Sequence, residues 1–253
     1  MFREVTATVE GSIAIVTLNR PDKRNALSLE MMSELTECLK RCVEQRTVII
    51  AAAGKVFCAG HDLNELASRE ESDYRKIFRV CTELMLTIQS LDIPVIAQVQ
   101  GLATAAGCQL VAACDLAVAS TEAAFATPGV KIGLFCTTPM VPLVGCIGRK
   151  RAMQLLLTGQ PIDSAVALDW GLVNRVVAPE QLSAAARELA CAIAGASRET
   201  VAIGKRAFYE QIAMDERAAY MCAQETMTSN AMVEDAQEGI SAFLSKRAPV
   251  WKA

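Results

Sequence analysis

The sequence is poor in the residues that most often build metal sites. Its 253 residues include a single histidine and no Cys-x-x-Cys pair. Common structural zinc clusters need four cysteine or histidine ligands in closely spaced pairs, so we expect no metal. The 10 cysteines are scattered among apolar neighbours, which predicts buried, reduced thiols that act as small hydrophobic side chains.

Two further classes of protein are disfavoured by what is missing. No apolar run approaches the ~20 residues that span a bilayer, so we expect no membrane span. The formal net charge is −3, whereas nucleic-acid-binding surfaces are usually strongly basic, so we expect no nucleic-acid partner. Residues 1–5 show neither the apolar core of a signal peptide nor the basic amphipathic character of a transit peptide. The sequence therefore predicts a cytoplasmic protein.

Apolar strands alternate with helical patterns along the first three quarters of the chain. Residues 28–43 and 74–91 repeat apolar side chains at helical spacing. This alternation predicts an α/β core over residues 1–196. An almost purely helical pattern follows, so we expect residues 197–253 to form a C-terminal helical region for oligomerisation. The strand-like segments are residues 13–18, 48–52, 95–99, 115–119 and 172–176.

Local signals set several of the expected boundaries. Gly11-Ser12 between two apolar segments predicts a β-hairpin. Ser28 is a plausible N-cap for the first long helix. Thr138 and Pro139 are expected as the N-cap and first residue of a later helix.

The only histidine, His61, lies in a glycine turn at residues 57–63, between a buried strand and a helix start. Asp62 and Glu65 have the spacing of a helix capping pair. Because a helix N-terminus presents unpaired N–H groups and partial positive charge, the turn is a candidate oxyanion site. The alternative is a capped turn with a surface histidine.

A second small-residue turn, at residues 105–108, also ends a strand and begins an apolar helix. Ligands of open α/β folds gather at the carboxyl ends of strands. Two N–H groups from two such turns could hold one oxygen atom and stabilise an enolate or a tetrahedral oxyanion. The alternative is that the small residues only permit tight packing of helix on strand.

These segments resemble the enoyl-CoA hydratase/isomerase, or crotonase, family over essentially the full length of the chain. The chain is most similar to a subgroup of enoyl-CoA hydratase domain-containing proteins, with which it shares the Gly60-His61-Asp62 turn. The resemblance implies an α/β fold that is a spiral of ββα units with a C-terminal helical trimerisation region. The matching segments are residues 20–27, 57–63, 94–107, 114–117, 157–159, 171–173 and 238–247.

The resemblance also implies a ligand and the residues that bind it. The ligand would be an acyl-CoA thioester, with coenzyme A as part of the substrate and no permanently bound cofactor. Its carbonyl oxygen would lie between the backbone N–H groups of His61 and Ala106. The partner subunits would be further copies of the chain, as a homotrimer or as a hexamer made of two trimers.

The coenzyme A moiety would be bordered by backbone and by basic side chains. The resemblance places Arg24 and Ala26, with Ala59 and Leu63, beside the adenine and pantetheine. It also brings Lys246 or Arg247 near a phosphate, from the same or a neighbouring subunit. The alternative for Lys246 and Arg247 is a basic helix end that favours the helix dipole.

The sequence departs from the family at its acid–base positions. Hydratases of the family use two glutamates, and this chain has Gln109 and Gly129 there; Thr137 replaces an acidic residue of other relatives. An amide cannot accept a proton from water and glycine has no side chain, so hydratase activity is doubtful. Of the possible substitutes, Asp115 is expected to be structural, and Cys136 to be a buried and inert thiol.

Three functions remain open at this point. The first is an acyl-CoA enzyme, nominally an enoyl-CoA hydratase or isomerase of fatty-acid metabolism, that acts through its oxyanion hole. The second is a decarboxylase or other enolate chemistry, which needs no base. The third is a non-catalytic acyl-CoA-binding protein. Because a transit peptide is not evident, a bacterial, cytoplasmic member of the family is expected.

Overall fold

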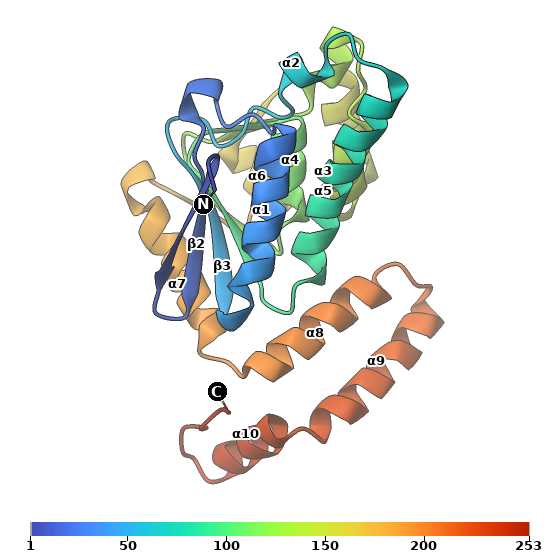
Figure 1. Cartoon of the computed structure of the whole chain (residues 1–253). Helices are drawn as coiled ribbons and strands as arrows, with labels where there is room; N and C mark the ends of the chain where they lie inside the picture. The colour runs from blue at the N-terminus through green and yellow to red at the C-terminus, as the bar shows by residue number, and fades with distance from the viewer. Residues whose placement is uncertain (1, 253) are drawn as a thin grey trace.

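The computed structural model describes residues 2–252 as an α/β core with a helical extension (Figure 1). The larger sheet contains six strands within these residues. β1 and β2 form the expected antiparallel hairpin, and all later neighbours in this sheet are parallel. In spatial order the strands are β1 (Val5–Glu10), β2 (Ile13–Leu18), β3 (Thr47–Ala52), β4 (Val95–Val99), β6 (Leu116–Ser120) and β9 (Arg175–Val177).

The two faces of the larger sheet are both buried, because side chains alternate along each strand. Ile49 and Ile96 belong to a cluster that includes Ala186 of α7 (Leu182–Ala194). Val48 and Ile50 belong instead to the main core cluster, together with apolar side chains of α1. The helices on the side of α1 are α1 (Leu29–Arg41), α3 (Glu71–Ser90), α4 (Ala106–Ala113) and α5 (Thr137–Thr158).

A smaller sheet adjoins both glycine turns: its strand β5 leads into the second turn and pairs with Cys58 of the first. β4 is followed at once by β5, which leads directly into α4. The order strand, strand, helix recurs as β1-β2-α1, β4-β5-α4 and β6-β7-α5, which confirms the expected spiral of ββα units. In the described chain this sheet comprises β5 (Leu102–Thr104), β7 (Ala124–Ala126) and β8 (Ile162–Asp163).

The C-terminal helices form an extension on the side of the core opposite to α2 (Leu63–Leu66) (Figure 1). None of the residues of α9 is buried. The region therefore presents much of its surface away from its own core. Its helices are α8 (Arg198–Gln211), α9 (Glu216–Ala231) and α10 (Glu234–Leu244).

A buried ion pair fastens this extension to the larger sheet. The Lys205 ammonium of α8 donates to Asp115 at 2.7 Å and to the carbonyl oxygens of Ile88 and Ile93 at 2.8 and 3.0 Å. The Tyr209 hydroxyl donates to the other Asp115 oxygen at 2.8 Å. All three ammonium protons are used, so the buried charge is compensated. Asp115 has the structural role expected from the sequence.

Two expected boundaries are wrong. The N-cap residue of α5 is Cys136, not Thr138, so Pro139 is the third helical residue. Proline is tolerated there because the first four N–H groups of a helix have no partner within it. The expected strand at 172–176 is only Arg175–Val177, because the Leu172 N–H still bonds the Ala167 carbonyl at the end of α6 (Ser164–Trp170). No helix in residues 2–252 is long and apolar enough to span a membrane.

Candidate active site

The first turn is held between two neighbouring segments. Cys58 pairs with β5, since its N–H donates to the Leu102 carbonyl oxygen at 3.1 Å. Leu27 pairs with the turn itself. Its N–H donates to the Gly60 carbonyl oxygen at 2.7 Å, and its carbonyl oxygen accepts from the Asp62 N–H at 3.1 Å. In such a parallel bridge the intervening residue directs its own N–H to the opposite side. The His61 N–H therefore points away from Leu27.

The second turn contains an unusual backbone conformation. Ala105 has φ +50° and ψ −118°, although it is not glycine. Such conformations cost on the order of 1–3 kcal/mol and cluster at functional sites. The Ala105 N–H donates to the Ala126 carbonyl at 2.9 Å, which helps to fix the turn. Ala106 is the first residue of α4, where an N–H group has no partner within the helix.

The two turns touch at Gly60. Its φ of +87° suits glycine, and a Cβ built on it would lie 2.9 Å from the Ala105 Cβ and 3.4 Å from the Ala106 nitrogen. Within residues 2–252, neither the His61 nor the Ala106 amide donates a hydrogen bond. The contact between the turns therefore lies next to two backbone amides that have no acceptor in the described chain.

Asp62 is the N-cap of α2, as the sequence predicts, but Glu65, its expected capping partner, bonds a different segment. Its carboxylate accepts from the Asn64 N–H at 3.0 Å and from the Arg20 guanidinium at 3.0 Å. Burial opposes ionisation, yet these bonds hold the pKa of Asp62 below its ordinary value. Glu65 accepts from the Leu29 N–H at 2.8 Å and ties α2 to α1. The reciprocal capping pair is therefore not formed.

His61 is half-buried and both nitrogens of its imidazole are buried, so the alternative of a surface histidine is wrong. Its ring lies edge-on to Phe78 of α3, with centroids 5.7 Å apart. Both ring nitrogens are buried without a hydrogen-bond partner in the described chain. Burial lowers the pKa of His61 to about 4, so the ring is neutral at pH 7. A neutral ring whose two nitrogens are both buried is not available to solvent as a base.

Gln109 lies one turn after Ala106 in α4 and is only 4% exposed. Its Oε1 accepts from the Cys81 thiol at 3.9 Å. Through Phe78, which contacts His61, and Cys81, which contacts Gln109, one face of α3 packs against both segments of the site. Both residues belong to the apolar helical repeat of residues 74–91, and their spacing carries no signal of the site.

Position 129 is closed to any side chain. A Cβ on Gly129 would overlap the Leu134 carbonyl oxygen and lie 2.7 Å from the Cys136 sulfur. Burial raises the pKa of Cys136, so its thiol is protonated at neutral pH and is a poor nucleophile. Thr137, the first residue of α5, is exposed. No carboxylate therefore stands at position 109, 129 or 137, where the family resemblance led us to look for one.

The residues expected to border coenzyme A come together beside the first turn. The Ala59 N–H donates to the Arg24 carbonyl at 3.0 Å. Arg24 is exposed, Ala26 is half-buried beside Leu27, and Leu63 begins α2 with 57% of its surface exposed. These four positions form a rim next to the two donors.

Lys246 and Arg247 do not join this rim in their own chain. They follow α10, which lies at the end of the molecule opposite to α2 (Figure 1). Arg247 forms a two-pronged ion pair with Glu238 at 2.6 and 2.7 Å. Lys246 and Arg247 can therefore reach such a site only in a neighbouring copy of the chain.

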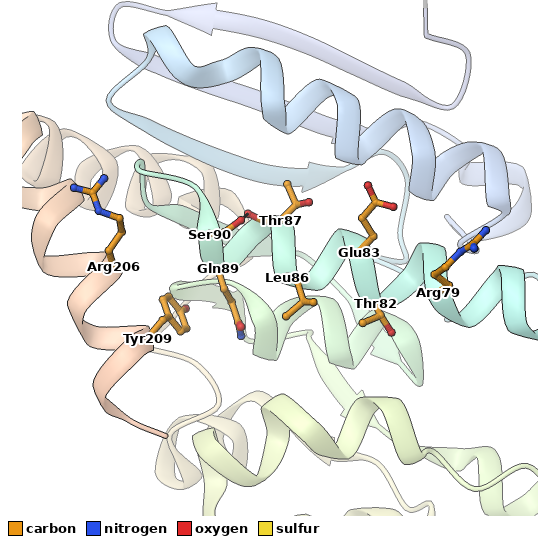
Figure 2. A pocket seen from close by; sticks show the side chains of 9 residues that line it. All are labelled: Arg79, Thr82, Glu83, Leu86, Thr87, Gln89, Ser90, Arg206 and Tyr209. Atoms are coloured by element: carbon orange, nitrogen blue, oxygen red, sulfur yellow. Dashed lines mark hydrogen bonds between the residues drawn. The ribbon is translucent and has the colours of Figure 1, made fainter. Parts of the chain in front are cut away.

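A groove of about 630 Å³ lies between α3 and α8, away from the two turns (Figure 2). Figure 2 shows Gln89 of α3 close to Tyr209 of α8. None of the expected site residues lines it. The lining residues are Arg79, Thr82, Glu83, Leu86, Thr87, Gln89, Ser90, Arg206 and Tyr209.

Gly129→Ala is expected to lower the free energy of unfolding by about 1–3 kcal/mol or more, because the added methyl must displace backbone. The matched control is Gly145→Ala, since a Cβ at this glycine of α5 meets no atom within 4 Å. The control should be neutral or stabilising by up to about 1 kcal/mol. Urea denaturation measures both. Equal stability of the two variants would show that position 129 is open.

The stability of the protein should fall between pH 6.5 and 4 through His61. Its folded pKa of about 4 lies below the ~6.5 of an unfolded histidine, so protonation favours unfolding. The loss is about 3 kcal/mol across this window. His61→Gln should remove this pH-dependent loss. The measurement is the free energy of unfolding of the variant and of the unmodified protein, from urea denaturation at each pH. Because the chain has one histidine, its NMR titration is unambiguous, and a midpoint near 6.5 would contradict the burial argument.

Comparison with known proteins identifies the family. The family model described as enoyl-CoA hydratase/isomerase matches residues 8–253. A Danio rerio protein named enoyl-CoA hydratase domain-containing protein 3, mitochondrial, is 49% identical over 96% of this chain and 85% of its own length. The resemblance seen in the sequence motifs, including its subgroup, is thereby confirmed.

Solved structures agree with this assignment. A crystal structure of an enoyl-CoA hydratase from Mycobacterium smegmatis superposes with a TM-score of 0.96, at 46% identity and over 98% of this chain and 99% of that one. The crystal structure of the human enoyl coenzyme A hydratase domain-containing protein 3 superposes with a TM-score of 0.95, at 44% identity. The match covers 98% of this chain and 100% of the human chain.

The expectation of a bacterial, cytoplasmic protein is wrong by the same comparison, because the relatives of 44% to 49% identity from Homo sapiens and Danio rerio are mitochondrial by name. Residues 1–5 could not decide the compartment, since targeting segments are removed from mature proteins. The family model, the relatives and the solved structures agree, and the chain belongs to the enoyl-CoA hydratase/isomerase family.

Proposed function

We propose that this protein binds acyl-CoA thioesters and polarises their carbonyl between the backbone N–H groups of His61 and Ala106. The observation that carries the proposal is the contact between two turns that each present an unused amide. Preorganised donors of this kind stabilise the negative oxygen of an enolate, and each is worth ~10²–10³ in rate. Coenzyme A is part of the substrate, and no resident cofactor is required.

The chemistry that follows is enolate chemistry without a carboxylate base. Relatives such as the short-chain-enoyl-CoA hydratase of Clostridium acetobutylicum are hydratases by name. Hydration needs groups that accept and return protons, and this chain has Gln109 and the closed Gly129 at those positions. Loss of carbon dioxide from a malonyl-type thioester needs an oxyanion hole and no such base. It is the reaction that these residues support best.

The rim beside the first turn suits the rest of the ligand. Lys23 and Arg24 are exposed there, and in the described chain neither forms an ion pair. Free cations next to the candidate oxyanion hole complement the phosphates of coenzyme A. Arg24, Ala26, Ala59 and Leu63 are the positions we assign to its nucleotide and pantetheine.

The exposed apolar side chains of the C-terminal extension favour self-association. We assign residues 197–253 to subunit contacts within a homotrimer, alone or paired into a hexamer, in which Lys246 and Arg247 approach a neighbour's coenzyme A. Isolated exposed hydrophobic residues are ordinary, but a contiguous set marks an interface. The side chains concerned include Tyr220, Met221, Met227, Met232, Phe243 and Leu244.

Sedimentation equilibrium should give at least three times the chain mass of 27.1 kDa. Phe243, which is 83% exposed, is the variant of choice, since Phe243→Asp should weaken the assembly without disturbing the fold of one chain. Circular dichroism supplies that control. A monomer at all concentrations would remove the oligomerisation role of this region.

The oxyanion hole can be tested by infrared spectroscopy of butanoyl-CoA labelled with ¹³C at its carbonyl. Binding should lower the carbonyl stretching frequency, because two donated hydrogen bonds weaken the C=O bond. Ala106→Pro should lose a large part of this shift, and any turnover of a malonyl-type thioester should fall by ~10²-fold or more. Proline suits the first position of a helix but also restricts the residue before it, and Ala105 has φ +50° and ψ −118°. Circular dichroism and urea denaturation therefore establish that the Ala106→Pro variant is folded before its shift is compared.

The matched control is Ala106→Gly, which keeps the N–H group and should keep the shift. Calorimetry with the same thioester measures affinity in parallel. Absence of binding at millimolar ligand would overturn the proposal, and so would an unchanged shift in Ala106→Pro. Rapid hydration of crotonyl-CoA by the unmodified protein would show that the missing carboxylates are not needed.

A further inference from the structure

The contact between Cys81 and Gln109 sets the orientation of the Gln109 amide. The two side chains come from α3 and α4, and the thiol donates to Oε1 at 3.9 Å. Cys81 is fully buried, and burial raises the pKa of its thiol to about 12. The sulfur therefore keeps its proton and remains a donor.

This arrangement leaves the Nε2 end of the amide free. Within residues 2–252, Gln109 Nε2 has no hydrogen-bond partner, and it is not among the buried polar atoms that are sealed from solvent. Buried amides without a partner are costly. A group that is 96% enclosed and yet presents two unused N–H bonds is therefore poised for an acceptor.

The other groups around the site do not compete for that acceptor. The His61 ring nitrogens are themselves sealed from solvent. At position 129 there is no side chain, and the adjoining Cys136 thiol and Leu134 carbonyl fill the space. Of His61, Gln109 and position 129, Gln109 alone has a side-chain donor that is not sealed from solvent.

We propose that Cys81 positions Gln109 as a hydrogen-bond donor, and that the site thereby selects thioesters whose acyl chain carries an acceptor oxygen near the thioester. A glutamate at this position would accept; this glutamine donates. Gln109 follows Ala106 by one helical turn, about 5 Å, so the acceptor is expected about two carbons beyond the carbonyl. The inference rests on the proposed binding of acyl-CoA and names its substrate class.

A matched pair of ligands tests this inference by calorimetry. Methoxyacetyl-CoA has the shape of butanoyl-CoA, with an ether oxygen in place of the third carbon, and that oxygen can only accept. The unmodified protein should bind methoxyacetyl-CoA about threefold to tenfold more tightly, as one neutral hydrogen bond allows. Gln109→Met should bring the ratio of the two dissociation constants to about one, and Gln109→Glu should reverse it, while butanoyl-CoA still binds to both variants.

Cys81 is a positioning residue and is tested through the same ratio. Cys81→Ala should reduce the preference because the amide is free to turn, and Cys81→Ser should restore it with a hydroxyl donor. The affinity for butanoyl-CoA should stay constant, which shows that the site is folded. Equal affinities in the unmodified protein, or an unchanged ratio in Cys81→Ala, would overturn this inference alone. If neither thioester binds, the proposed function fails with it.

Discussion

The site depends on one close approach, that of Gly60 to Ala105 and Ala106. A side chain at position 60 would collide with the Ala105 methyl group, so the two turns can meet only because this residue is glycine. The contact also requires Ala105 to adopt a conformation that costs on the order of 1–3 kcal/mol. Hydrogen bonds on each side hold the arrangement, from Leu27 to Gly60 and from Ala105 to Ala126. The His61 and Ala106 amides, which have no partner in the described chain, lie in these two turns and are the donors of the proposed oxyanion hole.

In the proposed mechanism the chain has the two oxyanion donors and lacks the two carboxylates of a hydratase. The proposed donors are backbone groups, so they survive changes of side chain, as the presence of histidine at position 61 illustrates. The expected acid–base positions depend on side chains, and here they hold an amide and a glycine. The loss at Gly129 extends to the backbone, because the Leu134 carbonyl and the Cys136 sulfur fill the space that a side chain would enter. A single substitution to glutamate there cannot restore the second carboxylate without a local rearrangement.

Much of the architecture follows from the sequence alone. The hairpin, the first long helix capped by Ser28 and the two glycine turns are local features, set by periodicity and turn chemistry, and the structure has them as expected. What could not be predicted are contacts between segments far apart in the chain. Glu65 has the spacing of a capping partner, yet it bonds Leu29, because α1 brings a free N–H group within reach. Cys81 looks like any apolar helical residue until α3 is packed against Gln109.

The most direct test of this account is a crystal structure of the protein with butanoyl-CoA bound. The account predicts the thioester oxygen about 2.7–3.1 Å from both the His61 and the Ala106 nitrogens, which is the geometry of an oxyanion hole. It also predicts the coenzyme A moiety along the rim at Arg24 and Leu63. A thioester bound elsewhere, for example in the groove between α3 and α8, or one with its oxygen out of reach of both amides, would contradict it.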